Sequence, residues 1–185
     1  MRHRAGDRVE VVITFLAMEG RPAYPRPHLP LGPVSALIAA ERPPAWYFLD
    51  LYDAVGREYE WSDRHDEPRA ALDAFLHDPA VTLYTFVRAG WPHGFFLLDA
   101  REPGIVDLGF LGLVPEAIGR GLGTFLLHTA VHMAWDRPGT GRLTVNTNTL
   151  DHPRALPLYQ KAGFAPVRRE TRVRVLTRDR DMIEA

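Results

Sequence analysis

The chain has 185 residues, a formal net charge of −1 and no cysteine. This length predicts one domain, residues 1–185, with a substantial core. A nearly neutral chain lacks the general attraction of basic proteins for nucleic acid or anionic membranes, so we expect neither partner. The absence of cysteine excludes disulfides and a cysteinyl acyl-enzyme.

Two further features bear on the source and location of the protein. The N-terminus is polar, and no segment approaches about 20 uninterrupted apolar residues, which predicts a cytoplasmic protein. Lys161 is the only lysine among 22 basic Lys and Arg residues. This bias is typical of a GC-rich genome and predicts a bacterial source.

The first part of the chain predicts one strand, a loop and three helices. The apolar run Val9 to Met18 suits a strand. The segment Glu19 to Pro33 contains five prolines and is predicted to be a loop. Residues 34–61 predict one short and one longer helix broken at Pro43-Pro44, and residues 67–77 predict a third helix.

The middle of the chain predicts antiparallel strands. Val81 to Val87 and His93 to Asp99 are expected to form a hairpin around residues 89–92. Ile105 to Val114 is rich in β-formers and is the next expected strand.

A glycine-rich segment follows this strand. Gly119, Gly121 and Gly123 stand before a run in which apolar residues recur at spacings of three and four, which predicts an amphipathic helix. Glycines allow close approach of the backbone to a ligand, and the free N–H groups of a first helical turn bind anions. The pattern therefore predicts a phosphate site, although an ordinary glycine-rich turn also fits it.

Two common nucleotide motifs do not fit this segment. A P-loop requires Gly-Lys-Ser/Thr at the start of the helix, whereas Leu122 and Thr124 follow the glycines here. A dinucleotide-binding fingerprint requires a third glycine where Thr124 stands. We therefore expect the pyrophosphate of another cofactor.

The last part of the chain predicts a strand, a helix and two strands. Arg142 to Asn148 is the strand, and Asp151-His152-Pro153 is typical of a helix entrance. Phe164 to Arg169 and Arg172 to Thr177 are expected to be two separate strands.

Residues 105 to 170 resemble the GNAT superfamily, whose members transfer acyl groups from acyl-CoA, usually acetyl-CoA, to amines. The segment from Ile118 to Gly123 is similar to the family's loop signature Gln/Arg-x-x-Gly-x-Gly/Ala. The segment from His152 to Phe164 is similar to Asn-x-x-Ala-x-x-x-Tyr-x-x-x-Gly-Phe. Ile118 replaces the polar first residue of one motif, and His152 replaces the asparagine of the other.

The resemblance implies an α/β (α+β) fold with a mixed, mostly antiparallel central sheet flanked by helices. It implies acetyl-CoA as co-substrate. The absence of a strong acidic or basic patch favours a small-molecule amine over a long charged peptide as acceptor, and the absence of cysteine favours direct transfer. A homodimer is possible. Residues 105–170 would form the CoA-binding core. The residues expected to bind the cofactor are Leu113, Val114, Ile118, Gly119, Arg120, Gly121, Leu122, Gly123, Thr124, Asn148 and Tyr159.

Three alternatives remain at this point. The chain could be a non-catalytic acyl-CoA-binding or sensing module, as the replaced Ile118 and His152 suggest. It could acetylate an amine of a protein or peptide. It could also bind a phosphate ligand unrelated to CoA.

Three side chains are candidates for catalysis. Asp107 is the first candidate base, because histone-acetylating members of the superfamily place a glutamate there. This role requires burial that raises the pKa of the carboxyl. The sequence is equally consistent with a charged residue on the solvated face of a strand. His152 is the second, since an imidazole suits neutral pH, although we favour a helix-capping role. Tyr159 is the candidate acid, because the family's tyrosine protonates the leaving thiolate.

The resemblance also implies a backbone N–H for the oxyanion, because the family frees one at a bulge in the strand before the glycine loop. Gly109 and Gly112 would permit such a bulge, and Leu111 or Leu113 would then supply the N–H.

His128 and His132 have the spacing of a metal pair, but Thr129 stands where a metalloprotease helix has glutamate. We therefore expect no metal, and both histidines in solvent.

The aromatic segment from Trp46 to Trp61, followed by Asp63 and Asp66, could line a pocket for a cationic or flat amine or simply pack the core. The identity of the acceptor stays open among aminoglycosides, amino acids, polyamines, biosynthetic intermediates and protein N-termini.

Overall fold

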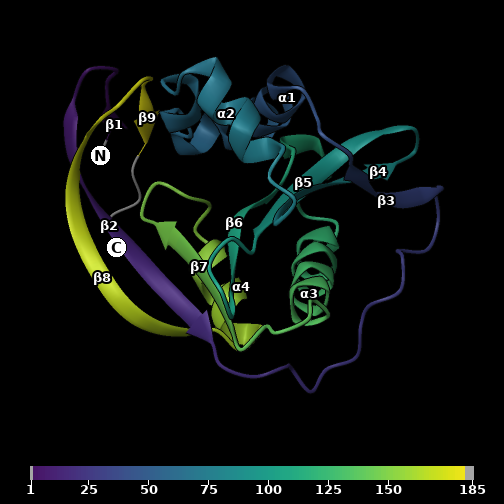
Figure 1. Cartoon of the computed structure of the whole chain (residues 1–185). Coiled ribbons are helices and arrows are strands. Elements are labelled where there is room, and N and C mark those ends of the chain that lie inside the picture. The colour runs from purple at the N-terminus through teal and green to yellow at the C-terminus, as the bar shows by residue number, and fades with distance from the viewer. Residues whose placement is uncertain (1, 182–185) are drawn as a thin grey trace.

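The computed structural model describes residues 2–181 (Figure 1). Its seven-stranded sheet has the order β3-β4-β5-β6-β7-β2-β8, and β1 pairs with β9 separately. All neighbouring pairs are antiparallel except β6 and β7. The strands are β1 (Arg2–His3), β2 (Arg8–Met18), β3 (Ser35–Ala40), β4 (Val81–Arg88), β5 (Trp91–Asp99), β6 (Ile105–Leu113), β7 (Arg142–Asn148), β8 (Ala165–Val175) and β9 (Arg180–Asp181).

Four α-helices flank the sheet, so the predicted fold class is confirmed. They are α1 (Ala45–Gly56), α2 (Arg69–Leu76), α3 (Leu122–Trp135) and α4 (Ala155–Lys161). Helix α1 packs on one face, where Phe48 meets Phe95 of β5 edge to face. Helix α3 packs on the other face, where Phe125 contacts Phe86 of β4. No helix among residues 2–181 is long and apolar enough to cross a bilayer.

Strands β6 and β7 stay together only at their beginnings. They pair at Ile105↔Arg142, Val106↔Leu143 and Asp107↔Thr144. Beyond Asp107, β6 continues its ladder with β5 alone, and β7 continues with β2. The second halves of the two parallel strands therefore separate, and the sheet is split at its centre.

The N-terminal strand β2 lies between β7 and β8, far from β3, the next strand in the sequence. The proline-rich segment between them crosses the molecule as the predicted loop (Figure 1). Tyr24 attaches this segment to α3, because its ring stacks on His128 with centroids 4.0 Å apart. Its carbonyl oxygen also accepts a hydrogen bond from Nε2 of His132 at 3.0 Å.

Three expectations about secondary structure are wrong. The short helix expected near residue 35 is the edge strand β3, which pairs with β4 from Ser35↔Arg88 to Ala40↔Leu83. Its alanine-rich sequence favours helix locally, but tertiary pairing overrides that preference. The hairpin turn is shorter than expected, because only Ala89 and Gly90 form it, with φ of 52° and 88°.

The two C-terminal strands expected after Phe164 form the single strand β8. Its ladder with β2 continues through Ile13↔Glu170 and Val12↔Thr171, where a break was expected. Nearly all of β8 is exposed, so the charged residues at its centre cost little and do not interrupt it. The other predicted helices and strands are present, and β7 begins and ends at the predicted residues.

Candidate active site

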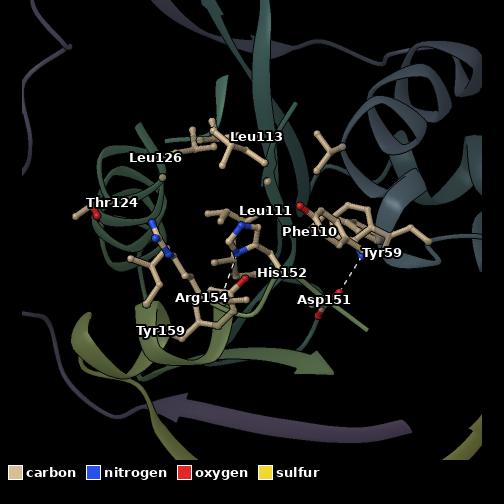
Figure 2. A pocket seen from close by; sticks show the side chains of 18 of the residues that line it. Tyr59, Phe110, Leu111, Leu113, Thr124, Leu126, Asp151, His152, Arg154 and Tyr159 are labelled. Atoms are coloured by element: carbon tan, nitrogen blue, oxygen red, sulfur yellow. Dashed lines mark hydrogen bonds between the residues drawn. The ribbon is translucent and has the colours of Figure 1, made fainter. Parts of the chain in front are cut away.

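A cleft with a volume of about 320 Å³ occupies the split between β6 and β7. Its walls come from β6, the loop before α3, the start of α4 and the segment after α1 (Figure 2). The lining residues are Val55, Tyr59, Trp61, Leu108, Gly109, Phe110, Leu111, Gly112, Leu113, Ile118, Gly119, Gly121, Gly123, Thr124, Leu126, Asn146, Asp151, His152, Arg154, Ala155, Leu158 and Tyr159.

The backbone of β6 has the expected bulge. Leu97 faces Phe110 and Leu98 faces Leu108, so Gly109 has no partner in the ladder. Past the bulge, the N–H of Val114 donates to the carbonyl oxygen of His93 at 3.0 Å. Because N–H directions alternate along an antiparallel strand, those of Leu111 and Leu113 point away from β5, toward the cleft.

Gly112 allows α1 to approach the cleft closely. A Cβ at Gly112 would lie 2.2 Å from Cγ1 of Val55 on α1. Gly112 is therefore required for the packing of α1 against β6, and the bulge itself is at Gly109.

The glycine loop shapes the entrance to α3. Gly119 and Gly121 have φ of 82° and 74°, the left-handed region that side chains rarely adopt. A Cβ at either position would meet no atom within 4 Å, so the requirement is conformational, and the space above the loop is open. Gly121 is the N-cap of α3, so the free N–H groups of the first turn begin at this open space.

Arg154 is a lining residue that the sequence analysis missed. It precedes α4, and its side chain reaches across the cleft toward Thr124 in the first turn of α3 (Figure 2). A guanidinium opposite a helix N-terminus provides a second set of donors for an anion. Its position directly before Ala155 of the second motif was the available signal.

Tyr159 of α4 lies on the cleft and is buried. Its ring meets Phe164 edge to face, with centroids 5.9 Å apart. Burial, and then the negative charges of Asp151 and Asp107, raise the pKa of its hydroxyl above the ordinary value. The phenol is therefore protonated at neutral pH, and it hydrogen-bonds to no other residue within 2–181.

His152 also lines the cleft, and it caps the chain at the entrance to α4. Its Nδ1 accepts the N–H of Arg154 at 3.1 Å. With Nδ1 as acceptor, the neutral ring carries its hydrogen on Nε2 and acts as a donor there. This geometry favours the capping interpretation over a direct base.

Asp151 accepts three hydrogen bonds at the edge of the same cleft. Oδ1 accepts from Nε1 of Trp61 at 3.2 Å. Oδ2 accepts from the hydroxyl of Thr147 at 2.7 Å and from the N–H of Asn148 at 2.9 Å. The carboxylate therefore joins the segment after α1 to the loop between β7 and α4.

Asp107 lies outside the cleft, in a neighbouring pocket with Asp99, Arg101, Glu102, Ile105, Arg142 and Thr144. Its Oδ1 accepts the hydroxyl of Thr144 at 2.6 Å. Burial, together with the negative charges of Asp99 and Glu102, raises the pKa of its carboxyl. The structure therefore brings His152 and Tyr159 to one cleft and leaves Asp107 in the neighbouring pocket, where β6 and β7 are still paired.

The residues predicted to bind the cofactor divide into two groups. Six of them besides Tyr159 line the cleft: Leu113, Ile118, Gly119, Gly121, Gly123 and Thr124. Val114, Arg120, Leu122 and Asn148 are not lining residues. Val114 and Leu122 are buried, and Oδ1 of Asn148 accepts the N–H of Leu150 at 2.8 Å. Asn146, two residues earlier, faces the cleft instead.

Both histidines of α3 were expected in solvent, and this expectation is wrong. His132 is buried and donates to the carbonyl of Tyr24, and His128 stacks on the ring of Tyr24. The described part of the chain contains no group of three or more His, Cys, Asp or Glu residues that could hold a metal ion.

Solved structures share this fold at low sequence identity. A GCN5-related N-acetyltransferase from Sphaerobacter thermophilus is 20% identical with a TM-score of 0.62, over 93% of this chain and 53% of the other. A GCN5-related N-acetyltransferase from Kribbella flavida is 20% identical with a TM-score of 0.55, over 83% of this chain and 53% of the other. An aminoglycoside acetyltransferase from an uncultured soil metagenomic sample is 14% identical with a TM-score of 0.54, over 69% of this chain and 86% of the other.

The chain thus spans about half the length of the first two structures. A search of curated proteins found no match. The family model described as the acetyltransferase (GNAT) family matches residues 48–164, which include the split strands, the glycine loop and Tyr159. The chain belongs to the GNAT family of acetyltransferases.

Proposed function

We propose that the protein is an N-acetyltransferase that moves an acetyl group from acetyl-CoA to the amine of a small molecule. The observation that carries this proposal is the cleft between β6 and β7, which extends from the open N-terminus of α3 to the buried phenol of Tyr159. Hydrogen-bond donors for an anion, free backbone N–H groups and a phenolic proton donor therefore share one cavity.

The residues present fit the donor substrate. The open space above Gly119 and Gly121 accommodates a pyrophosphate, which the first turn of α3 and Arg154 would bind. One of the two β6 N–H groups that face the cleft, those of Leu111 and Leu113, would donate to a carbonyl oxygen of the pantetheine arm and leave the other for the reaction. When bound, acetyl-CoA supplies the activated thioester.

The reaction needs donors where charge develops. The amine nitrogen forms a bond to the acetyl carbon, and the N–H of Leu111 or Leu113 stabilises the oxygen that becomes negative. The carbon–sulfur bond then breaks, and Tyr159 gives its hydroxyl proton to the departing sulfur. The Nε2–H of His152 is a further donor on the wall of the cleft.

The proton lost by the amine goes to a base. We propose Asp107, acting through water, because its burial raises the pKa of the carboxyl toward the working range of a base. Its negative charge also contributes to the raised pKa of Tyr159. His152 is the weaker candidate, because its Nδ1 lone pair already accepts the N–H of Arg154.

Several finer expectations belong to the same proposal. The protein would work in the cytoplasm of a bacterium, without a nucleic-acid or membrane partner. A homodimer would use β8, which is an edge strand of the main sheet among residues 2–181. The alternatives are an acyl-CoA-sensing module and an enzyme that acetylates protein or peptide amines.

Calorimetric titration with acetyl-CoA, CoA and ATP tests the donor assignment. We expect stoichiometric binding of acetyl-CoA and no heat from ATP, because the glycine loop lacks the P-loop lysine. Absence of acetyl-CoA binding would contradict the proposal. Binding without thiol release across a broad panel of amines would indicate the sensing module instead.

A further inference from the structure

The end of the cleft remote from the glycine loop is aromatic. Tyr59 and Phe110 lie on the side opposite Thr124, with His152 between (Figure 2). Trp61 completes this wall, and its ring centroid is 5.6 Å from that of Phe110 and 5.4 Å from that of Tyr52. Val55 of α1 closes the wall beside Gly112.

This aromatic end carries one carboxylate. Among residues 2–181, Asp151 is the only Asp or Glu that lines the cleft, and Arg154, the only Arg or Lys there, extends toward α3. Burial, and then the negative charges of Asp151 and Glu58, raise the pKa of the Tyr59 hydroxyl, while the positive charge of Arg180 lowers it. Oδ1 accepts one hydrogen bond, from Trp61, and keeps a free lone-pair site.

These features select among amines. A single ammonium group is attracted by Asp151 and by the aromatic faces of Tyr59 and Trp61, while an apolar body covers the remaining wall. A polyamine or an aminoglycoside would bury further charges and hydroxyls without partners, which is unfavourable. An amino acid would bring its carboxylate near Asp151.

We propose that this end is the acceptor site and that it takes an aromatic monoamine without a carboxylate, such as an arylalkylamine. The inference rests on the proposed acetyltransferase function and names its acceptor class. The amine loses one proton and gains the acetyl group, and CoA leaves as the thiol.

Thiol release from acetyl-CoA with three amines tests the acceptor class. We expect kcat/KM for 2-phenylethylamine to exceed the values for spermidine and kanamycin by at least about tenfold, since unpaired polar groups weaken binding strongly. Equal or faster acetylation of spermidine or kanamycin would overturn the inference, and so would no turnover of 2-phenylethylamine.

Titration of the same protein with acetyl-CoA distinguishes failure of the acceptor inference from failure of the proposed function. If acetyl-CoA does not bind, the proposed function fails, and the acceptor inference fails with it. If acetyl-CoA binds and only kanamycin or spermidine is acetylated, the acceptor inference alone is wrong.

Two substitutions test the site itself. Tyr59→Ala should raise KM for 2-phenylethylamine by about tenfold and leave the Kd of acetyl-CoA within about twofold, because it removes an acceptor wall only. The matched control is Trp46→Ala, an aromatic side chain of α1 that is 59% exposed and does not line the cleft. An unchanged KM in Tyr59→Ala would overturn the inference, whereas the retained Kd shows that the variant is folded.

Discussion

The indole Nε1 of Trp61 donates to Oδ1 of Asp151 across the edge of the cleft at 3.2 Å. The two residues are 90 positions apart, and their contact joins the segment after α1 to the loop between β7 and α4. Because Trp61 and Asp151 both line the aromatic end, this hydrogen bond holds together two walls of the proposed acceptor site.

Asp151→Asn should weaken both stability and amine binding. The amide can still accept from Trp61, but its nitrogen cannot accept from the hydroxyl of Thr147 and the N–H of Asn148. We expect a loss of about 1–3 kcal/mol in the free energy of unfolding, measured with urea, and a higher KM for the amine. Asp66→Asn, at an exposed position, is the control. Equal stability of Asp151→Asn and the parent would show that these contacts contribute nothing.

Asp107→Asn should be more stable and slower than the parent. Because burial raises the pKa of Asp107, ionisation of this carboxyl in the folded protein costs stability at neutral pH. The advantage of the variant should therefore develop as the pH rises from the ordinary aspartate pKa, near 3.8, to the raised value, and it should vanish at lower pH. Urea unfolding between pH 3 and pH 8 measures this difference.

The same variant tests the base. The asparagine oxygen can still accept the hydrogen bond from the hydroxyl of Thr144, so a fall in activity would reflect the missing base and not a disturbed structure. We expect kcat to fall by about 100-fold, the lower range of general-base effects. An unchanged kcat would assign Asp107 a purely structural role.

Gly121→Ala should weaken acetyl-CoA binding. The substitution places a Cβ at φ 74°, which costs about 1–2 kcal/mol in the left-handed region, although the side chain meets no neighbour. Relaxation of this strain would move the first turn of α3, so we expect Kd to rise at least about fivefold. Gly6→Ala is a matched control with φ 89°, equally open space and a position outside the cleft. Similar effects of both substitutions on Kd would argue against the glycine loop as the phosphate site.

Arg154→Gln should also weaken acetyl-CoA binding, by about fivefold to tenfold, because a charge-assisted contact to phosphate is lost. The effect should shrink at high salt, where exposed charges are screened. Arg120→Gln removes an exposed arginine that does not line the cleft, and it should change Kd little. Titrations at two salt concentrations measure both variants, and a larger effect at Arg120 would reverse the assignment.

Local patterns predicted the structure from β6 to α3 well. The strand ending at Leu113, the glycine loop and the helix from Leu122 are encoded by neighbouring residues, and the structure contains all three. The family resemblance implied a bulge in this strand, which Gly109 and Gly112 would permit, and the structure has it at Gly109.

Long-range pairing explains what the sequence did not reveal. The alanine-rich segment from Ser35 became an edge strand only because β4 pairs with it. The insertion of β2 between β7 and β8 brings together residues such as Ile13 and Glu170, which no local pattern connects. Asp107 was placed correctly on a strand, but the pairing with Thr144 determines which pocket it faces.

Tyr159→Phe tests the proposed role of Tyr159 as the general acid. The substitution removes a hydroxyl without a hydrogen-bond partner among residues 2–181 and keeps the ring against Phe164. Tyr47→Phe is the control, because the hydroxyl of Tyr47 contacts Thr85, outside the cleft, at 2.8 Å.

The measurement is steady-state thiol release at saturating amine, beside calorimetric Kd values for acetyl-CoA. We expect Tyr159→Phe to lower kcat by about 100-fold, as for loss of a general acid, while Kd stays within about twofold and Tyr47→Phe matches the parent. A Tyr159→Phe protein with the kcat of the parent would contradict the proposed role of Tyr159.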